Sequence, residues 1–212
     1  MVEIGHDLVE VPEHRASHSL FKSVTERLLA LGALMALLPL LVIVAVLVKL
    51  DSRGPVMFRQ ARHGLGGRTF HIYKFRTMSA VASKEAFVQA SLNDVRVTRL
   101  GRFLRASSID ELPQLINVLT GDMALVGPRP HPLALDEQYR GEVARYMDRY
   151  QVRPGITGLA QVSGHRGPTP TVEAMAARVR YDLDYIETWS PRLDASIVLR
   201  TVVMLFLVRN GS

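Results

Sequence analysis

The composition of this 212-residue chain sets the first limits on its class. Hydrophobic residues make up 48% and charged residues 22%, which excludes a disordered or collagen-like chain and fits one domain with short attachments. The net charge is +6, and the 26 basic residues comprise 22 arginines and 4 lysines. Arginine binds phosphate bidentately, so this excess hints at phosphorylated partners, although a codon bias explains it equally well. Cysteine is absent, which excludes disulfides, thiolate metal sites and cysteine catalysis.

Residues 1–20 are polar and mildly acidic, and we expect a flexible solvated tail. His14 and His18 lie four residues apart, a spacing that on a helix lets two imidazoles bind one metal ion. An ordinary tail is the simpler interpretation.

An uncharged run of 21 residues, 28–48, follows the tail. At about 1.5 Å per residue a helix of that length measures about 32 Å, which matches a hydrocarbon core about 30 Å thick. A secretory signal is excluded because acidic residues precede the run and no small-residue cleavage site follows it. We therefore expect residues 21–50 to form a membrane-embedded helix.

Pro39, near the middle of this run, leaves two arrangements open. Proline removes a helical hydrogen bond, so the helix either spans the membrane with a kink or turns and returns to the same face. Length alone favours spanning. The residues just after the run include seven bases and one acid, Asp51, so the positive-inside rule places everything after residue 49 in the cytoplasm. The weakly charged tail could lie on either side of the membrane. These bases are Lys49, Arg53, Arg59, Arg62, Arg68, Lys74 and Arg76.

Residues 51–190 are predicted to form a cytoplasmic catalytic domain of the α+β class, helix-dominated with a small β-hairpin or sheet. Residues 69–75 alternate apolar and polar side chains, which indicates a strand. The glycines in the preceding HGLGG indicate a hairpin turn, because the sequence of a phosphate or dinucleotide loop is missing. Helices are expected near residues 98–105, 110–120, 133–150 and 171–188, without βαβ repetition.

The C-terminal segment, residues 191–212, contains an apolar run at 193–208 with one internal charge, Arg200. Sixteen residues are few for a membrane span, so we expect an interfacial helix that lies along the membrane. Burial in the core is the alternative.

Asp110 and Glu111, in SSIDELPQ, form the sharpest local motif. Ser108 and Glu111 fit a capping box, and Pro113 is typical of a helix's first turn. The two acids are therefore expected at a helix N-terminus, where the helix dipole keeps a carboxylate ionised. Taken alone, ordinary capping is the simpler interpretation of this motif.

Basic residues gather around the acidic pair in several short motifs. Prolines beside two of the arginines stiffen the backbone, which suits a phosphate clamp, while scattered surface arginines are the alternative. A carboxylate attacks phosphorus only where arginine, lysine or a divalent metal neutralises the phosphate oxygens, and an oxygen-only metal site on the two acids favours Mg²⁺ or Mn²⁺. The candidate bases are Lys74, Arg76, Arg102, Arg105, Arg129 and Arg153.

Taken together, YKFRTM, SSIDELPQLINVLTGDMALVGPRP, VRPGITGLAQVSG and YDLDYIETWS, preceded by an apolar helix and GPVMFRQ, resemble the bacterial sugar transferases. These are monotopic polyprenyl-phosphate phosphoglycosyl transferases, and the resemblance runs from about residue 21 to 209. It implies a bacterial inner-membrane enzyme with its catalytic domain on the cytoplasmic face. Such an enzyme transfers a sugar 1-phosphate from a UDP-sugar to undecaprenyl phosphate and releases UMP through a phosphosugar–aspartate intermediate.

The resemblance also implies roles for individual residues. Asp110 corresponds to the nucleophile and Glu111 to the Mg²⁺ (or Mn²⁺) site. The family's membrane helix is re-entrant and broken at a Ser-Pro step, for which this chain has Leu38-Pro39; the resemblance favours the re-entrant form. The phosphate-binding bases correspond to Lys74, Arg105 and Arg129, with Arg76 and Arg153 as further candidates.

The segments HPLALDEQY and 164–186 are most similar to undecaprenyl-phosphate glucose phosphotransferases that initiate exopolysaccharide synthesis. This ranks UDP-glucose first, UDP-galactose second and an N-acetylated sugar third. We expect contact with membrane lipid and no nucleic-acid partner, and homo-oligomerisation stays open. Two other functions remain: a catalytically silent adaptor that holds anionic lipids, and a conventional glycosyltransferase that releases UDP. The Asp110–Glu111 pair argues against the first, and the missing DxD and βαβ patterns argue against the second.

Overall fold

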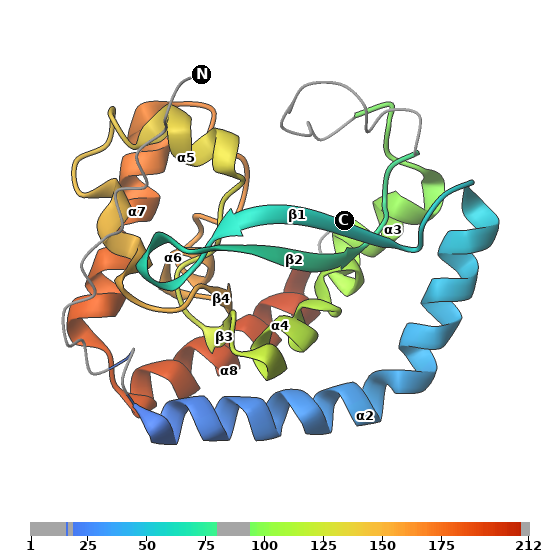
Figure 1. Ribbon diagram of the computed structural model, residues 1–212, viewed down its shortest axis with the longest axis horizontal. Coiled ribbons are helices and arrows are strands. Elements are labelled where there is room, and N and C mark those ends of the chain that lie inside the picture. The colour runs from blue at the N-terminus through green and yellow to red at the C-terminus, as the bar shows by residue number, and fades with distance from the viewer. Residues whose placement is uncertain (1–15, 17–18, 80–93, 209–212) are drawn as a thin grey trace.

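The computed structural model describes residue 16, residues 19–79 and residues 94–208 of the chain (Figure 1). The predicted tail, with His14 and His18, lies almost entirely outside the described residues. The described part is dominated by helices and contains two small sheets of two strands each, so the α+β prediction is confirmed.

The N-terminal helix α2, Leu20–Asp51, is longer than the predicted membrane segment by one residue at each end. It begins after Ser19, whose side chain accepts a hydrogen bond from the Lys22 amide and so caps the helix. Pro39 lies inside α2 without ending it, and Figure 1 shows the two parts of the helix running in different directions. Among the described residues, α2 is the one helix long and apolar enough to cross a membrane.

Both parts of α2 pack on the same body. In the first part, the buried Ala30 joins a core cluster with Phe70 and Leu115. In the second part, Val44 and Val48 join a cluster with Phe75 and Leu104. Much of the remaining apolar surface of α2 is exposed, including Leu31, Met35, Leu38, Val42, Ile43, Val46 and Leu47.

Polar contacts fix α2 to this body at its two ends. Near the start, Lys22 Nζ lies 2.6 Å from an oxygen of Asp194 and donates to the Val126 carbonyl at 3.1 Å. Near the end, the buried Arg76 donates to the carbonyls of Val48 and Ser52 at 3.1 and 2.5 Å. The ends of this long apolar helix are therefore held by one domain.

A β-hairpin of β1, Met57–His63, and β2, Thr69–Phe75, carries Lys74 into the body. The strands are antiparallel, and the turn between them contains Gly66 and Gly67 at φ 64° and 75°, which glycine adopts without strain. The predicted hairpin is thus confirmed. Asn117, fully buried, fastens β2 to the following helices because its amide group bonds the Tyr73 amide and the His71 carbonyl.

The predicted helix at 110–120 is two elements. After α3, Arg99–Ser107, a 3₁₀ turn η3, Ile109–Glu111, precedes α4, Gln114–Thr120. Ser108 separates α3 from η3 because it adopts the left-handed conformation with φ 59°. Pro113 occupies the position before α4, as expected of proline at a helix start. The acidic pair therefore lies in a tight turn between two helices.

The predicted helix at 133–150 is also divided. Arg145, with φ 59°, separates the short α5 from a 3₁₀ helix, η4. A short parallel pair, β3 and β4, lies below the hairpin in the view of Figure 1, and α6 follows β4. The bounds are β3 Ala124–Val126, α5 Leu133–Tyr139, η4 Tyr146–Gln151, β4 Gly155–Thr157, α6 Leu159–Val162 and α7 Val172–Thr188.

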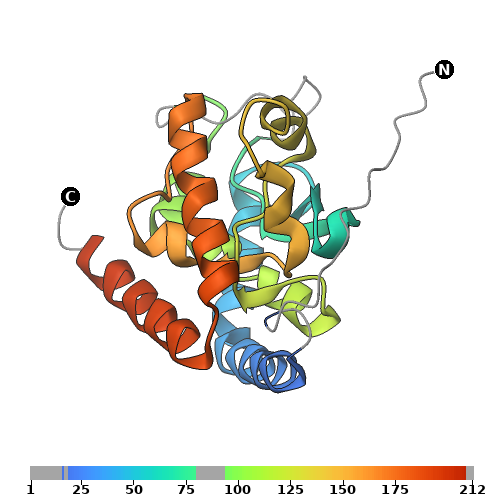
Figure 2. The same ribbon diagram turned by 90° about the vertical axis from the view of Figure 1, so that its left-hand side faces the viewer.

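The last helix, α8, Pro191–Val208, buries one side and exposes another. Ile197 is fully buried, whereas Val198, Leu199 and Val203 are between 42% and 65% exposed. Figure 2 shows α8 and α2 on the same lower side of the molecule. The helix thus packs on the core with one side and keeps an exposed apolar face on another, while its position along a membrane stays a prediction.

Candidate active site

The acidic pair lies on η3, where Ser108 starts the turn in a conformation that is strained for a residue with a side chain. The predicted capping box is wrong, because the Ser108 side chain makes no capping bond and accepts a hydrogen bond from Arg166 at 2.5 Å instead. The two acids have separate surroundings. Neither serves as a helix cap.

Glu111 is tied to two bases from distant parts of the chain. Its Oε1 lies 2.6 Å from Lys74 Nζ on β2, and Arg129 makes two bonds to the carboxylate at 2.5 and 3.1 Å. Burial acts to raise the pKa of Glu111, but the charges of Arg129 and Lys74 hold that pKa well below its ordinary value. Glu111 is therefore ionised throughout the physiological pH range and orients both bases.

Asp110 is buried, with 8% of its surface exposed, and no described residue donates a hydrogen bond to its carboxylate. Burial and the adjacent Glu111 charge raise its pKa to about 6, against the opposing effect of Lys74, Arg105 and Arg129. At neutral pH the carboxylate is mostly ionised and has no bonded partner among the described residues. These are the properties of a nucleophile held next to cations.

The structure brings Lys74 and Arg129 to the acidic pair, and Arg105 lies near enough for its charge to lower the pKa of Asp110. Arg105 is held by Thr77, whose hydroxyl accepts from its Nε at 2.8 Å. The other candidate bases lie elsewhere. Arg76 bonds carbonyls at the end of α2, Arg153 donates to the Gly121 carbonyl at the far end of α4, and Arg102 is exposed on α3.

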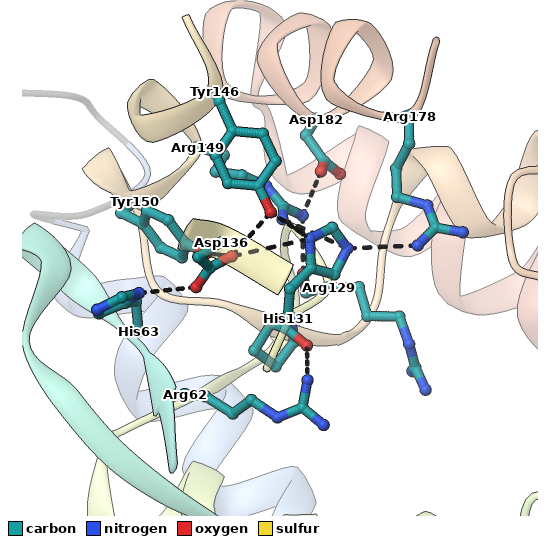
Figure 3. A network of polar contacts seen from close by, with 11 residues as sticks. Arg62, His63, Arg129, His131, Asp136, Tyr146, Arg149, Tyr150, Arg178 and Asp182 are labelled. Atoms are coloured by element: carbon teal, nitrogen blue, oxygen red, sulfur yellow. Dashed lines mark hydrogen bonds and ion pairs between the residues drawn. The ribbon is translucent and has the colours of Figure 1, made fainter. Parts of the chain in front are cut away.

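A buried polar network supports the Arg129 segment from behind, and sequence reasoning did not identify it (Figure 3). Arg149 donates to the Arg129 carbonyl at 2.7 Å and pairs with Asp182 at 2.5 Å. Arg62 donates to the Pro130 carbonyl at 3.2 Å. The backbone on both sides of the Arg129–Pro130 bond is thus fixed by arginines from β1 and η4.

Asp136 holds a second part of this network. Its Oδ1 accepts from the hydroxyls of Tyr146 and Tyr150 at 2.7 and 2.6 Å, and its Oδ2 lies 2.7 Å from His63 Nδ1. These groups come from three separate stretches of chain, so no short motif signals them. Their contacts lock α5, η4 and β1 together beneath the Arg129 segment (Figure 3).

The network carries more positive than negative charge. Arg62, Arg149 and Arg178 are buried, against the buried Asp136 and Asp182. His131 stays neutral, since burial and the charges of the neighbouring arginines hold its pKa well below the ordinary value. The surplus places a fixed positive field behind Arg129, which favours an anionic ligand in front of it.

An open pocket adjoins the acidic pair on its other side. Glu111 and Leu112 form part of one wall, and residues of α6 and α8, among them Val162, Thr201 and Met204, form another. Most of the lining is apolar. The site therefore has a cationic side, at Lys74 and Arg129, and an apolar side that leads to α8.

Comparison with known proteins agrees with this geometry. The family model described as bacterial sugar transferase matches residues 17–208. The chain belongs to this family. Three similar proteins are each named UDP-glucose:undecaprenyl-phosphate glucose-1-phosphate transferase. They come from Caulobacter vibrioides, Xanthomonas campestris and Escherichia coli.

The similarity to these relatives covers most of the chain. The Caulobacter vibrioides protein is 56% identical over 82% of this chain and 65% of its own length. The Xanthomonas campestris protein is 51% identical over 86% of the chain and 38% of its own length. The Escherichia coli protein is 49% identical over 89% of the chain and 40% of its own length. The chain thus spans between about two fifths and two thirds of the length of these three relatives.

Proposed function

We propose that this bacterial sugar transferase moves glucose 1-phosphate from UDP-glucose to undecaprenyl phosphate and releases UMP, the initiating step of an exopolysaccharide or related glycoconjugate. The observation that carries the proposal is the contrast within the acidic pair: Glu111 is bonded to Lys74 and Arg129, while Asp110 is buried beside them without a bonded donor among the described residues. The names of the relatives support glucose as the sugar. UDP-galactose is the second choice.

In the first step, an oxygen of the Asp110 carboxylate attacks the phosphorus that carries glucose. A bond forms between that oxygen and phosphorus, and the bond from phosphorus to the bridging oxygen breaks, so that UMP leaves with the bridging oxygen. Lys74 uses one of its three N–H groups on Glu111 and Arg129 uses two of its five, so both retain donors for the phosphate oxygens. These donors, with Arg105, would neutralise the charge that otherwise repels a carboxylate.

In the second step, a phosphate oxygen of undecaprenyl phosphate attacks the phosphorus of the phosphoglucosyl–Asp110 ester. The new bond completes a diphosphate between lipid and glucose, and the Asp110 carboxylate is released unchanged. Both steps displace a group from phosphorus beside the same cations. Asp110 is the nucleophile of the first step and the leaving group of the second, and one cationic side of the site therefore suffices for both transfers.

The acidic pair fits a Mg²⁺ or Mn²⁺ ion of the kind held by one or two carboxylates together with substrate phosphates. Glu111 Oε2 accepts a single hydrogen bond and retains a lone pair, and Asp110 has free oxygens. When bound, the metal would neutralise phosphate charge and stabilise the leaving UMP. The acidic pair supplies two carboxylates, so the phosphates of the substrate would complete the coordination of the ion.

We also propose that α2 is a re-entrant helix in the bacterial inner membrane and that the catalytic domain lies on the cytoplasmic face. The contacts of Lys22 and Arg76 support this, since both ends of α2 are fixed to one domain. A helix that crossed the bilayer would place its ends about 30 Å apart on opposite sides. The exposed apolar faces of α2 and α8 then lie in the membrane, with Pro39 inside the bent helix.

The experiment that tests the function measures which nucleotide purified protein releases from labelled UDP-glucose with Mg²⁺ and undecaprenyl phosphate. We expect UMP, no release with EDTA, and none from the Asp110→Asn variant. Mass spectrometry of acid-quenched enzyme without acceptor should show a phosphoglucose adduct on the peptide containing Asp110. UDP as the product would establish a conventional glycosyltransferase instead, and no release from a panel of UDP-sugars would favour the lipid-binding adaptor.

A further inference from the structure

We propose that the apolar pocket beside Glu111 binds the first isoprene units of the polyprenyl phosphate acceptor, and that Arg166 binds the phosphate of that acceptor. We call this hollow, between η3–α4 on one side and α6–α8 on the other, the acceptor pocket. The proposal rests on the proposed function, because it assigns a place to that reaction's second substrate. It goes further in adding a binding residue outside the acidic pair and its three bases.

The lining of the acceptor pocket suits a hydrocarbon chain. Side chains from four elements or their flanks are apolar: Leu112, Leu115, Ile156, Val162 and Met204. The Thr201 hydroxyl donates to the Ile197 carbonyl at 2.8 Å and lies 2.7 Å from the Thr157 hydroxyl, which therefore donates to it, so both hydroxyl hydrogens of the lining are bonded. A uridine or a sugar needs many hydrogen-bonding partners, whereas an isoprenoid needs none.

Arg166 supplies the one basic group among the described residues of the lining. Its side chain is exposed, and one of its N–H groups donates to Ser108 Oγ at 2.5 Å. A guanidinium has five N–H groups, so donors remain for a phosphate. Ser108 starts the turn that carries Asp110, which places Arg166 beside the nucleophile's own backbone. A lipid phosphate bound there would be next to the phosphorus that it must attack.

The loop that carries Arg166 is held from below. Arg178, which is 5% exposed, donates from Nε to the His165 carbonyl at 3.0 Å and from a terminal nitrogen to the Gly167 carbonyl. The residues on both sides of Arg166 are thus bonded to one buried arginine. The loop is preorganised to present Arg166 without further ordering on binding.

The position of the acceptor pocket fits a substrate that arrives from the membrane. Glu111 belongs to its wall at the catalytic end, and Thr201 and Met204 belong to α8. The other face of α8 exposes Leu199, Val202 and Val203. A polyprenyl phosphate is apolar along its length and charged at one end, which matches an apolar hollow with a single base near the reacting carboxylate.

The test compares steady-state kinetics of Arg166→Gln with wild type and with Arg140→Gln, which removes an exposed arginine paired only with Glu137 on α5. Full-length protein is assayed in vesicles while UDP-glucose and undecaprenyl phosphate are varied in turn. We expect kcat/KM for undecaprenyl phosphate to fall by a factor of ten or more in Arg166→Gln, with partial recovery in Arg166→Lys. We expect kcat/KM for UDP-glucose to stay within twofold, because acceptor binding does not enter the first step.

A second arm measures binding without turnover. In the Asp110→Asn background, a fluorescent polyprenyl phosphate should bind more tightly than the matching polyprenol, and Arg166→Gln should remove this difference. Met204→Gln should weaken both lipids. Phosphatidic acid should compete poorly.

Several results would overturn the assignment while leaving the proposed function intact. They are an equal loss of kcat/KM for both substrates, no loss for the acceptor, or equal competition by phosphatidic acid, which would make the hollow a general phospholipid site. If wild-type protein released no UMP, the proposed function would fail. The binding arm would still decide whether Arg166 recognises a polyprenyl phosphate.

Discussion

Replacing Asp110 by asparagine should stabilise the folded protein at neutral pH even though it removes the proposed nucleophile. The pKa of Asp110 is raised from 3.8 to about 6, mainly by burial and then by the charge of Glu111. Between these two pH values the folded state binds more protons than the unfolded state, so the free energy of unfolding decreases as pH rises through this window. Above pH 6 the full cost of the buried charge is present.

The magnitude follows from the size of the shift. At about 1.4 kcal/mol per pKa unit, a rise from 3.8 to about 6 corresponds to about 3 kcal/mol of lost stability at pH 8. At pH 4.5 the cost falls to about 1 kcal/mol, because the folded carboxyl is then protonated. Asparagine has the same shape without the charge, so it should recover this energy, or about 6–12 °C in Tm at pH 8.

Thermal unfolding of detergent-solubilised protein in EDTA, at pH 8 and pH 4.5, measures the effect. Glu111→Gln is the matched control and should do the opposite. Its carboxylate is stabilised by Arg129 and Lys74, so its removal should cost about 3–5 kcal/mol at pH 8. The reasoning is refuted if Asp110→Asn is no more stable than wild type at pH 8, or if its gain is the same at both pH values.

Three further predictions concern activity and folding. The kcat/KM for UDP-glucose should fall about tenfold per pH unit below pH 6 as Asp110 becomes protonated. Arg105→Gln should move this acidic part of the pH profile to higher pH, because the charge of Arg105 lowers the pKa of Asp110. A flat profile between pH 5 and 8 would contradict the prediction. Arg149→Met should lower the free energy of unfolding in urea by about 3–5 kcal/mol, because it leaves the buried Asp182 unpaired. Arg145→Met removes an exposed ion pair and should change this free energy little. Gly101→Ala should abolish most UMP release, because the new Cβ would lie 2.1 Å from the Thr77 carbonyl oxygen and push α3, which carries Arg105, away from the site. Gly32→Ala is the control, since open space surrounds that position. Equal activity of the two variants would refute the argument.

The parts of the fold that sequence predicted are those with a local signal. The alternation of apolar and polar side chains in residues 69–75, after a glycine-rich turn, predicted the hairpin. The uncharged run of residues 28–48 predicted α2. The predicted helix boundaries are wrong at Ser108 and Arg145, because each residue adopts a left-handed conformation that its residue type does not predict. Such breaks are set by tertiary contacts rather than by propensity.

The candidate site shows the same division. The motifs identified the acidic pair, Lys74 and Arg129, and the structure brings these together. The buried Arg149–Asp182 pair joins residues 33 apart in sequence, and no local pattern signals it. Arg76 lies two residues after Lys74 in the same motif, a spacing that would put both side chains on one face of a continuous strand. However, β2 ends at Phe75, and past this end Arg76 bonds carbonyls of α2.

The attachment of both ends of α2 to one domain has a consequence for how the protein reaches its membrane. If the two ends stay on one side of the bilayer, the acidic and basic side chains ahead of residue 20 never have to pass through hydrocarbon. Each such passage would cost about 2.5–3.5 kcal/mol per charged residue at the bilayer centre. Insertion then amounts to placing a bent apolar helix in one leaflet from the side where the chain is synthesised, and it needs no translocation of the residues just ahead of residue 20.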